Sequence, residues 1–369
     1  MPRKKSFSVN VCRTIAMVGT MQLCTDVAAQ SSVTIGGSLD QGFIYTNNYG
    51  GSSRVGAVSN ARWPSYLYFS GKEELSSDLQ AVFGISTTFR LSDGGFVEDG
   101  SLGGLTYVGL HSKSFGKIEM GRLLDPSINL LFNLPAFNNV LAFTPGDADR
   151  AGGEYFNSSI SYTTPKFGGW EAYTLYSPGN KNGAQIASSP AGRVASIGAN
   201  YAGPSMMANV LWTSTNGAYI TPTLFGMKTF LGQPVVPFAP IRVESRNTLG
   251  AGASYFLSPA ITLKGGISKV EYKLAGTSSS MFNKAATVVY QISTPTSLTM
   301  GFSRSNMGAS RYDTLSLFLD YAFSKRTDIY IGAYGQKTRG SNVTATLFTQ
   351  MPSSSDKQFA VNFGIRTQF

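Results

Sequence analysis

The stretch FAVNFGIRTQF, residues 359–369, decides the fold of this chain. Almost every second position is apolar or aromatic, from Phe359 through Phe363 and Ile365 to Phe369, and the positions between them are small or polar. Successive side chains point to opposite faces of a β-strand. The stretch therefore predicts a strand with one apolar and one polar face.

The same alternation recurs along the chain, for example in residues 33–45, 79–90 and 249–257. A period of two is the signature of strands that are covered on one face only. We count about sixteen such segments. Their predicted starts lie near residues 32, 62, 78, 104, 116, 156, 169, 193, 204, 247, 260, 284, 297, 312, 327 and 358.

The connections between these segments alternate between short turns, such as residues 114–115 and 324–327, and longer loops. The predicted loops are residues 46–61, 92–103, 124–155, 178–192, 215–246, 272–283, 305–311 and 338–357. No apolar run approaches the ~18 residues of a transmembrane helix. We therefore expect an all-β fold, a 16-stranded antiparallel transmembrane β-barrel with short periplasmic turns and long external loops.

A secreted β-sandwich is the alternative, because it alternates in the same way with its apolar face inward. Three features favour an outward apolar face. Charges lie in the middle of the polar faces, where a packed interior would satisfy them only at a high free-energy cost. The chain holds 41 glycines, and it stops within a strand at an aromatic residue, as a closed barrel does. The charges are Arg90, Arg122, Asp320 and Arg366.

The N-terminal segment has the order of a secretory signal. Arg3, Lys4 and Lys5 precede an apolar stretch over residues 14–24, and Val-Ala-Ala at residues 27–29 supplies the small residues of a cleavage site. We predict a signal peptide over 1–29 and one barrel domain over 30–369. A short amphipathic helix is the alternative for this segment.

Composition excludes several classes of chemistry. Both cysteines, Cys12 and Cys24, lie in the predicted signal, so the mature chain has no disulfide or thiol chemistry. The chain carries 30 basic and 20 acidic residues, and without the four bases and one acid of the signal its net charge is +7. There is no basic block for nucleic acid, no metal-ligand cluster and no catalytic motif. The single histidine, His111, follows a strand beside a tight turn, as a solvated rim residue does.

Several segments, taken in order, resemble the trimeric general diffusion porins of Gram-negative bacteria, of the β-proteobacterial type. The similarity covers nearly the whole mature chain. The matching segments are QSSVTIGGSLD (30–40), SYLYFSGKEEL (65–75), DLQAVFGISTTF (78–89), YVGL (107–110), Phe115-Gly116, Gly121-Arg122 with Asp125, NSSISYTTPKFGG (157–169), SKRTDIY (324–330) and the terminal Phe369.

The resemblance implies an outer-membrane channel for passive diffusion of small hydrophilic solutes and ions, with no enzymatic step and no cofactor. It implies a homotrimer with outer-membrane lipid and lipopolysaccharide, the barrel-assembly machinery and periplasmic chaperones as partners, and no nucleic acid. The terminal strand, with Phe363, Ile365 and Phe369, would be the signal that the insertion machinery reads.

In the family the third loop folds into the barrel and narrows it, which corresponds here to about residues 124–155. Its apolar centre, residues 130–143, either packs against the barrel wall or a neighbouring subunit, or lines the constriction. The charges that we expect at the constriction from this loop are Asp125, Asp147, Asp149, Arg150 and Glu154.

The opposite wall of such a channel carries a ladder of arginines, whose field sorts solutes by charge. Arg122 matches one of them, but Tyr66 and Gly104 stand where the family has two others. Arg62, four residues before Tyr66, and Arg90 are candidates to restore part of the ladder. With Arg366 and the net charge, they suggest a weakly anion-favouring pore; near-neutral selectivity is the alternative.

Two other functions fit the same barrel. A substrate-specific channel with a saturable site would show aromatic or basic tracks along its lumen. A structural or adhesive barrel with a plugged lumen would conduct almost nothing. Current recordings distinguish the three.

Overall fold

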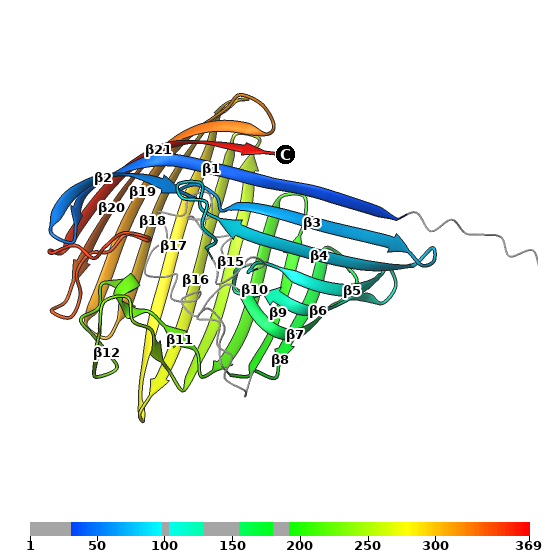
Figure 1. Ribbon diagram of the computed structural model, residues 1–369, viewed down its shortest axis with the longest axis horizontal. Helices are drawn as coiled ribbons and strands as arrows, with labels where there is room; N and C mark the ends of the chain where they lie inside the picture. Colours follow the sequence, from blue (N-terminus) through cyan, green and yellow to red (C-terminus); the bar gives the residue numbers. More distant parts are fainter. Residues whose placement is uncertain (1–30, 98–102, 129–154, 180–191) are drawn as a thin grey trace, which may run out of the picture.

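The computed structural model describes residues 31–97, 103–128, 155–179 and 192–369. One antiparallel sheet closes on itself to form a barrel (Figure 1). The wall strands are β1 (Ser32–Tyr49), β2 (Ser52–Ser59), β3 (Ser65–Glu74), β4 (Leu79–Phe89), β5 (Thr106–Ser112), β6 (Gly116–Leu124), β7 (Tyr155–Thr163), β8 (Trp170–Ser177), β9 (Val194–Ala202), β10 (Met206–Asn216), β15 (Ser245–Ser258), β16 (Ile261–Leu274), β17 (Thr277–Ser293), β18 (Thr296–Met307), β19 (Ser310–Ala322), β20 (Thr327–Arg339) and β21 (Lys357–Gln368).

Strand β1 closes the barrel. One of its edges pairs with β21, from Ser38 opposite Gln368 to Thr46 opposite Ala360. Its other edge pairs first with β3 and then with β2, so these two strands are successive parts of one wall position. The 17 labelled strands therefore make a closed barrel of 16 wall positions, as predicted.

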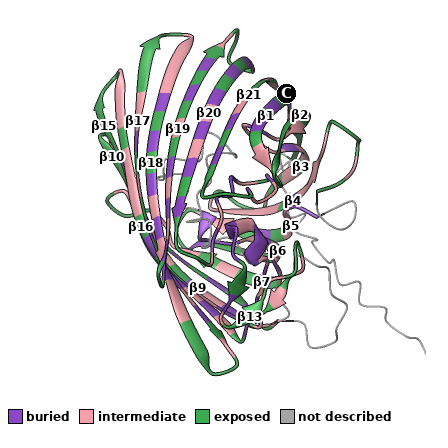
Figure 2. Ribbon diagram, turned by 90° about the vertical axis from the view of Figure 1, so that its left-hand side faces the viewer, coloured by how far each residue is buried: buried purple, intermediate pink, exposed green. Residues whose placement is uncertain are grey.

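Alternation in the sequence becomes an outer apolar face and an inner polar face. On β21 the outer residues Phe359, Phe363 and Ile365 are 43%, 58% and 50% exposed, whereas Gln358 and Asn362 on the inner face are buried. Bands of buried and exposed residues alternate along neighbouring strands in the same way (Figure 2). An apolar outer face is suited to contact with the hydrocarbon layer of a membrane, and a polar inner face is suited to contact with water.

The predicted strand starts agree closely with the structure, with two differences. Residues 46–61, predicted as a loop, extend β1 to Tyr49 and form β2 after a turn at Gly50 and Gly51, both with positive φ. Strand β17 begins at Thr277 rather than near residue 284, since a tight turn with positive φ at Ala275 and Gly276 follows β16. Two positive φ values suit the twist of a two-residue hairpin.

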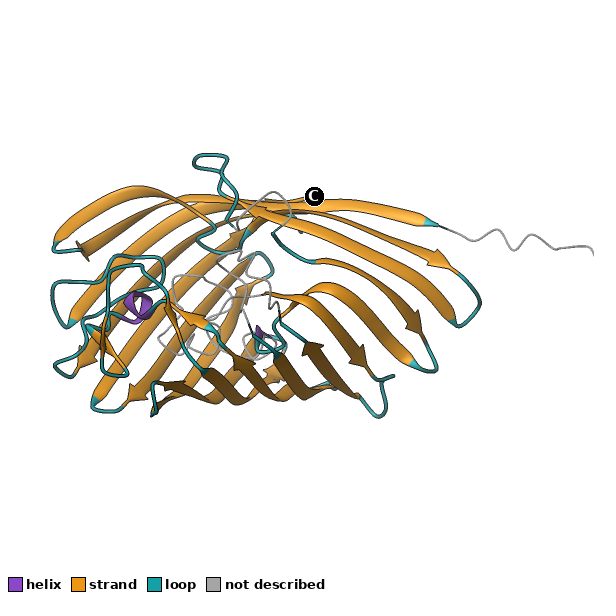
Figure 3. Ribbon diagram, turned by 60° about the horizontal axis from the view of Figure 1, so that its bottom comes forward, coloured by secondary structure: helices purple, strands orange, loops and turns teal. Residues whose placement is uncertain are grey.

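The connections are long at one end of the barrel and short at the other, with the long ones towards the lower left of Figure 1. The longest described one, residues 217–244, holds β11 (Tyr219–Ile220), the 3-10 helix η4 (Pro222–Phe225), β12 (Thr229–Phe230), β13 (Gln233–Pro234) and β14 (Ile241–Arg242) (Figure 3). Within the described ranges, none of the helices has the length and apolar character needed to cross a membrane.

Candidate functional site in the barrel lumen

A buried carboxylate shapes the wall between β2 and β3. Asp40 Oδ1 accepts the backbone N–H of Ala61 at 3.2 Å and the hydroxyl of Tyr330 at 2.7 Å. Its Oδ2 accepts the N–H groups of Arg62 at 3.2 Å and Trp63 at 3.0 Å. Bonds from backbone N–H groups to a carboxylate are charge-assisted and strong. Asp40 thus fixes the bulge at residues 60–64 that carries Arg62.

Arg62 does not stand free on the wall. Its Nη1 contacts the carboxylates of Asp320 and Asp328, and its guanidinium lies 5.6 Å from the ring centroid of Phe318. Asp328 Oδ2 also accepts Arg366 Nε at 2.9 Å and Nη2 at 2.6 Å. We call Asp40, Arg62, Asp320, Asp328 and Arg366 the lumen charge cluster. Its three acids outnumber its two bases, so the two arginines present no net positive charge to a passing anion.

The other predicted arginines lie elsewhere. Arg90 is just past the end of β4, where its Nε bonds Asp93 at 3.1 and 3.0 Å and its Nη1 donates to Phe96 O at 2.9 Å. Arg122 Nε donates to Gly103 O at 2.8 Å, and its Nη1 donates to Asn157. Both guanidinium groups are therefore held by local contacts.

The third loop starts inside the barrel. Asp125, directly after β6, pairs with Arg246 on β15, with 3.0 Å between Arg246 Nη2 and Asp125 Oδ2, and neither side chain is exposed. Burial raises the pKa of the Asp125 carboxyl, and Arg246 opposes that shift. Ile128 packs in an apolar cluster with Ile44, Tyr330 and other residues of the far wall. The described start of the loop is therefore folded inward, as predicted.

The remaining predicted loop residues, Asp147, Asp149, Arg150 and Glu154, lie outside the described residues, as does the apolar stretch 130–143. The predicted signal segment 1–29 lies outside them too. Their roles stay predictions.

Tyrosines line one part of the lumen. Tyr66 pairs with the buried, inward Ser38, and Tyr68 pairs with Gly36. The two rings stack with centroids 6.0 Å apart. Tyr107, opposite Gly84 on β4, lies so close that a Cβ on Gly84 would be 2.5 Å from its ring. Of the two positions where the family has a further arginine, position 66 thus presents a flat aromatic ring and position 104 has no side chain.

The external mouth holds an apolar core that the sequence did not suggest. Residues from the 217–244 connection, such as Ile220, Phe225 and Phe230, pack on Tyr272, Tyr312 and other inward residues of the neighbouring strands. Phe230 and Tyr272 meet edge to face at 5.3 Å. This connection therefore covers part of the inner wall at its external end. The sequence shows that this connection contains apolar residues, but no sequence pattern indicates the part of the inner wall on which they pack.

The terminal strand forms the seam of the barrel. Phe369 exchanges two backbone hydrogen bonds with Gly37, each 3.1 Å long. Phe363 stacks on Phe43 of β1 with ring centroids 5.8 Å apart. Phe363, Ile365 and Phe369 all project from the outer face and are about half exposed. Their role in recognition by the insertion machinery stays a prediction.

A closed 16-position barrel with an apolar outside, a polar inside and an inward third loop defines an outer-membrane porin fold. A model of the Gram-negative porin family matches residues 15–341. The chain belongs to this family, whose place is the bacterial outer membrane.

Individual relatives of known sequence are consistent with this family. The chain is 32% identical to outer membrane porin protein 32 of Delftia acidovorans over 158 residues, 39% of this chain and 43% of that relative. It is 23% identical to major outer membrane protein P.IB of Neisseria lactamica over 341 residues, 87% and 93% of the two chains. The matches to the Delftia and Bordetella pertussis porins each span under half of those proteins, 43%.

Two solved structures share the fold. The anion-selective porin from Comamonas acidovorans has a TM-score of 0.74 at 23% identity, covering 92% of this chain and 100% of that one. OmpT of Vibrio cholerae in its trimer form has a TM-score of 0.65 at 11% identity, covering 92% and 99%.

Proposed function

We propose that this protein is an outer-membrane channel through which small hydrophilic solutes and ions diffuse passively. One observation carries the proposal: polar and charged side chains line the inside of a closed barrel whose outside is apolar. Such a lumen fills with water, because its polar groups would otherwise lack partners. The inward start of the third loop, at Asp125, supports a constriction within that lumen.

The ion preference that we propose is weak and favours anions. Arg62 and Arg366 contribute little to it, since Asp320 and Asp328 lie against them. The external mouth has exposed bases without an ion pair in the described part of the chain, which raise the local concentration of anions. These bases are Arg54, Arg193, Lys228 and Arg242. The Comamonas acidovorans protein of similar fold is an anion-selective porin.

Planar-bilayer recordings test both parts of the proposal. Discrete conductance steps in KCl are expected, and a KCl gradient should give a small reversal potential of the sign for chloride preference. A clear potassium preference would contradict the proposed selectivity, and an absence of conductance would contradict the channel itself and favour a plugged structural barrel.

We further propose that the chain assembles as a homotrimer, as the trimer form of the similar OmpT structure suggests. Conductance steps that arrive in threes are the expected result. Outer-membrane lipid and lipopolysaccharide around the barrel, and the assembly machinery and chaperones that deliver it, remain the proposed partners.

A substrate-specific channel is the second candidate, and the stacked pair Tyr66 and Tyr68 favours it. Ring faces bind planar or sugar-like solutes by stacking. Concentration-dependent block of conductance by one solute, reduced by Tyr66→Ala, would establish a saturable site. Block that is unchanged in Tyr66→Ala would exclude the pair as that site.

A further inference from the structure

Three tyrosines follow one another down the inner wall of β3 to β5, towards the end of the barrel with the short turns. Tyr66 and Tyr68 are successive inward residues of β3, and their rings stack with centroids 6.0 Å apart. Ser70 is the next inward residue of β3 and lies opposite Gly84 of β4. Gly84 in turn lies opposite Tyr107 of β5, and all three tyrosines are partly exposed. We call Tyr66, Tyr68 and Tyr107 the tyrosine track.

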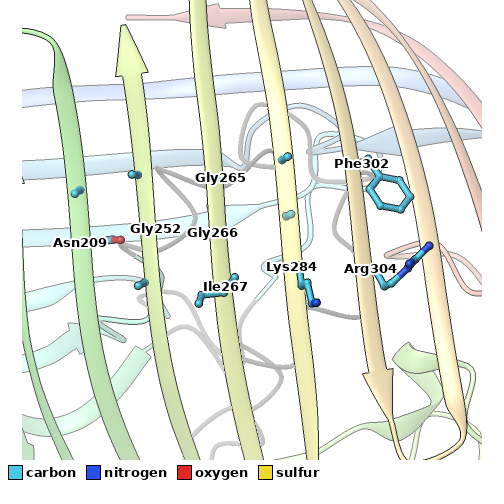
Figure 4. Close-up of a pocket in the computed structure, with 13 residues that line it drawn as sticks. Asn209, Gly252, Gly265, Gly266, Ile267, Lys284, Phe302 and Arg304 are labelled. Atoms are coloured by element: carbon cyan, nitrogen blue, oxygen red, sulfur yellow. The ribbon is translucent and has the colours of Figure 1, made fainter.

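Small residues lie beside the track and across the barrel from it. Gly121 of β6 is opposite Tyr107. Strand β16 lies eight wall positions from β4, which is half of the way around a barrel of 16. There Gly252, Gly266 and Ala285 follow one another in one paired row of the inner face, and Figure 4 shows the two glycines on neighbouring strands. Side chains of these rows therefore occupy little of the space in which a solute would meet the tyrosine rings.

A row of polar side chains lies on the same inner face, closer to the short turns. Glu74 is opposite Gln80, Gln80 is opposite His111, and His111 is opposite Lys117. Gln80 Nε2 donates to Glu74 Oε1 at 2.6 Å. His111 Nε2 lies 2.9 Å from Oε1 of Glu119, the inward residue of β6 that lies between Lys117 and the level of Tyr107. We call these five residues the polar row. A solute on the track therefore meets carboxylate, amide and imidazole groups next.

The charges of this part of the lumen are balanced, but hydrogen-bond acceptors remain open. The acids Glu74 and Glu119 are matched by the bases Lys72 and Lys117, and Lys72 Nζ lies 3.8 Å from Glu74 Oε1. The contacts of both carboxylates use Oε1. Within the described ranges, neither Oε2 has a hydrogen-bond partner of its own. This wall therefore gives little preference to an ion of either sign and offers strong acceptors to a solute that carries hydroxyl groups.

We propose that the tyrosine track and the polar row together bind a neutral sugar that passes through the lumen, an inference that rests on the proposed channel function. The apolar C–H face of a sugar ring stacks on the tyrosine rings. Its hydroxyl groups donate to Oε2 of Glu74 and Glu119 through charge-assisted hydrogen bonds. A sugar is favoured over a planar aromatic solute, because an aromatic ring without donors would leave the two carboxylates without partners.

Block of the KCl current by maltotriose, with the full chain in planar bilayers, tests the proposal. Maltotriose at millimolar concentration should reduce the current in a saturable way. Tyr107→Ala should raise the half-blocking concentration about fivefold, as expected for the loss of one stacking ring. Glu119→Gln should raise it by a similar factor of about five, because a charged acceptor becomes neutral. The current of each variant is compared with its own value without sugar, since Tyr107→Ala also widens the lumen.

Two substitutions on the outer face are matched controls. Tyr176→Ala removes a ring that is 44% exposed on the outer face of β8, and Glu73→Gln removes an exposed carboxylate from the outer face of β3. Both should leave the half-blocking concentration unchanged. Weakening by these controls equal to that by Tyr107→Ala and Glu119→Gln would overturn the proposal, since it would not depend on the inner wall.

Failure of this inference can be distinguished from failure of the proposed channel. KCl conductance steps that maltotriose does not block would overturn the sugar site and leave passive diffusion in place. An absence of KCl steps would contradict the channel itself. Block by benzoate, a planar aromatic anion, without block by maltotriose would show that the tyrosine track binds aromatic rings rather than sugars, which would also overturn the proposal.

Discussion

Arg246 on β15 and Asp125 at the start of the third loop form a buried ion pair, with 3.0 Å between Nη2 and Oδ2. Arg246 lies on β15 and Asp125 directly follows β6, and these two strands are not neighbours in the wall. This pair sets where the third loop enters the lumen, and it makes the position of the loop dependent on a residue 121 positions away in the sequence.

Removal of one partner of this pair should lower the stability of the barrel. Arg246→Met leaves the Asp125 carboxylate buried and uncompensated, which costs roughly 3–5 kcal/mol. We expect a lower midpoint of unfolding in urea and noisier open-channel current. The double variant Asp125→Leu with Arg246→Met removes both charges and should recover most of the stability. A double variant as unstable as the single one would contradict a role for the pair itself.

Charge removal in the lumen charge cluster should shift ion selectivity in opposite directions. Asp328→Asn releases Arg62 and Arg366 from a shared acid, so the reversal potential in a KCl gradient should move towards chloride. Arg366→Gln should move it towards potassium. Arg90→Gln is the matched control, because Arg90 is exposed and paired with Asp93 in an external loop. A shift by Arg90→Gln as large as that by Arg366→Gln would show that position in the lumen does not matter.

Glycine at position 84 gives the ring of Tyr107 its place against the wall. In Gly84→Ala the new Cβ would lie 2.5 Å from Tyr107 Cε1, so the ring must move into the lumen. Such overpacking costs about 1–3 kcal/mol, and single-channel conductance should fall. Gly335→Ala is the control, since nothing lies within 4 Å of its added Cβ. Restoration of the conductance by a second change, Tyr107→Ala, would confirm that the ring is the obstacle.

The apolar core at the external mouth should control access to the pore. Phe230→Ala removes a ring that is 1% exposed and packed on Tyr272. The loss of this ring should destabilise the packing of the connection on the inner wall by about 3–5 kcal/mol. The 217–244 connection should then detach from the inner wall more often, with larger conductance and more rapid fluctuations. Phe238→Ala, at a ring in the same connection that is 49% exposed, should leave the current unchanged. Equal effects of the two variants would exclude the core as the anchor.

The alternation of apolar and polar residues predicted the barrel well, because each membrane-facing strand must have one apolar and one polar face. The same pattern did not predict strand segments that extend beyond the membrane. In Thr277–Ser280 both faces are polar, and in β2 each face has a single valine, Val55 or Val58, among polar and small residues. A period of two therefore leaves almost no trace in these stretches of the sequence. The sequence therefore predicts loops where the structure has the hairpin of β1 and β2 and the first residues of β17.

Candidate residues were harder to place than strands. The sequence identified Arg366 and Asp320 as charges on polar faces and Arg62 as a candidate for the arginine ladder, but Arg62 lies 266 positions from Asp328. Only the register around the closed barrel brings these groups together, and that register depends on pairs from both ends of the chain. The number of arginines in the sequence is therefore larger than the number of unpaired positive charges that these groups present in the lumen.

The seam between β1 and β21 has a consequence for the order of events in assembly. Phe359 on β21 donates its backbone N–H to Asn47 Oδ1, a residue 312 positions earlier. Closing so long a loop carries a large entropic cost that is repaid only once the neighbouring strands are in place. Until the last strand arrives, β1 keeps an unpaired edge that invites wrong partners. We therefore expect the seam to form last, and a delay in delivering β21 to leave the edges of β1 and β20 open to wrong pairing.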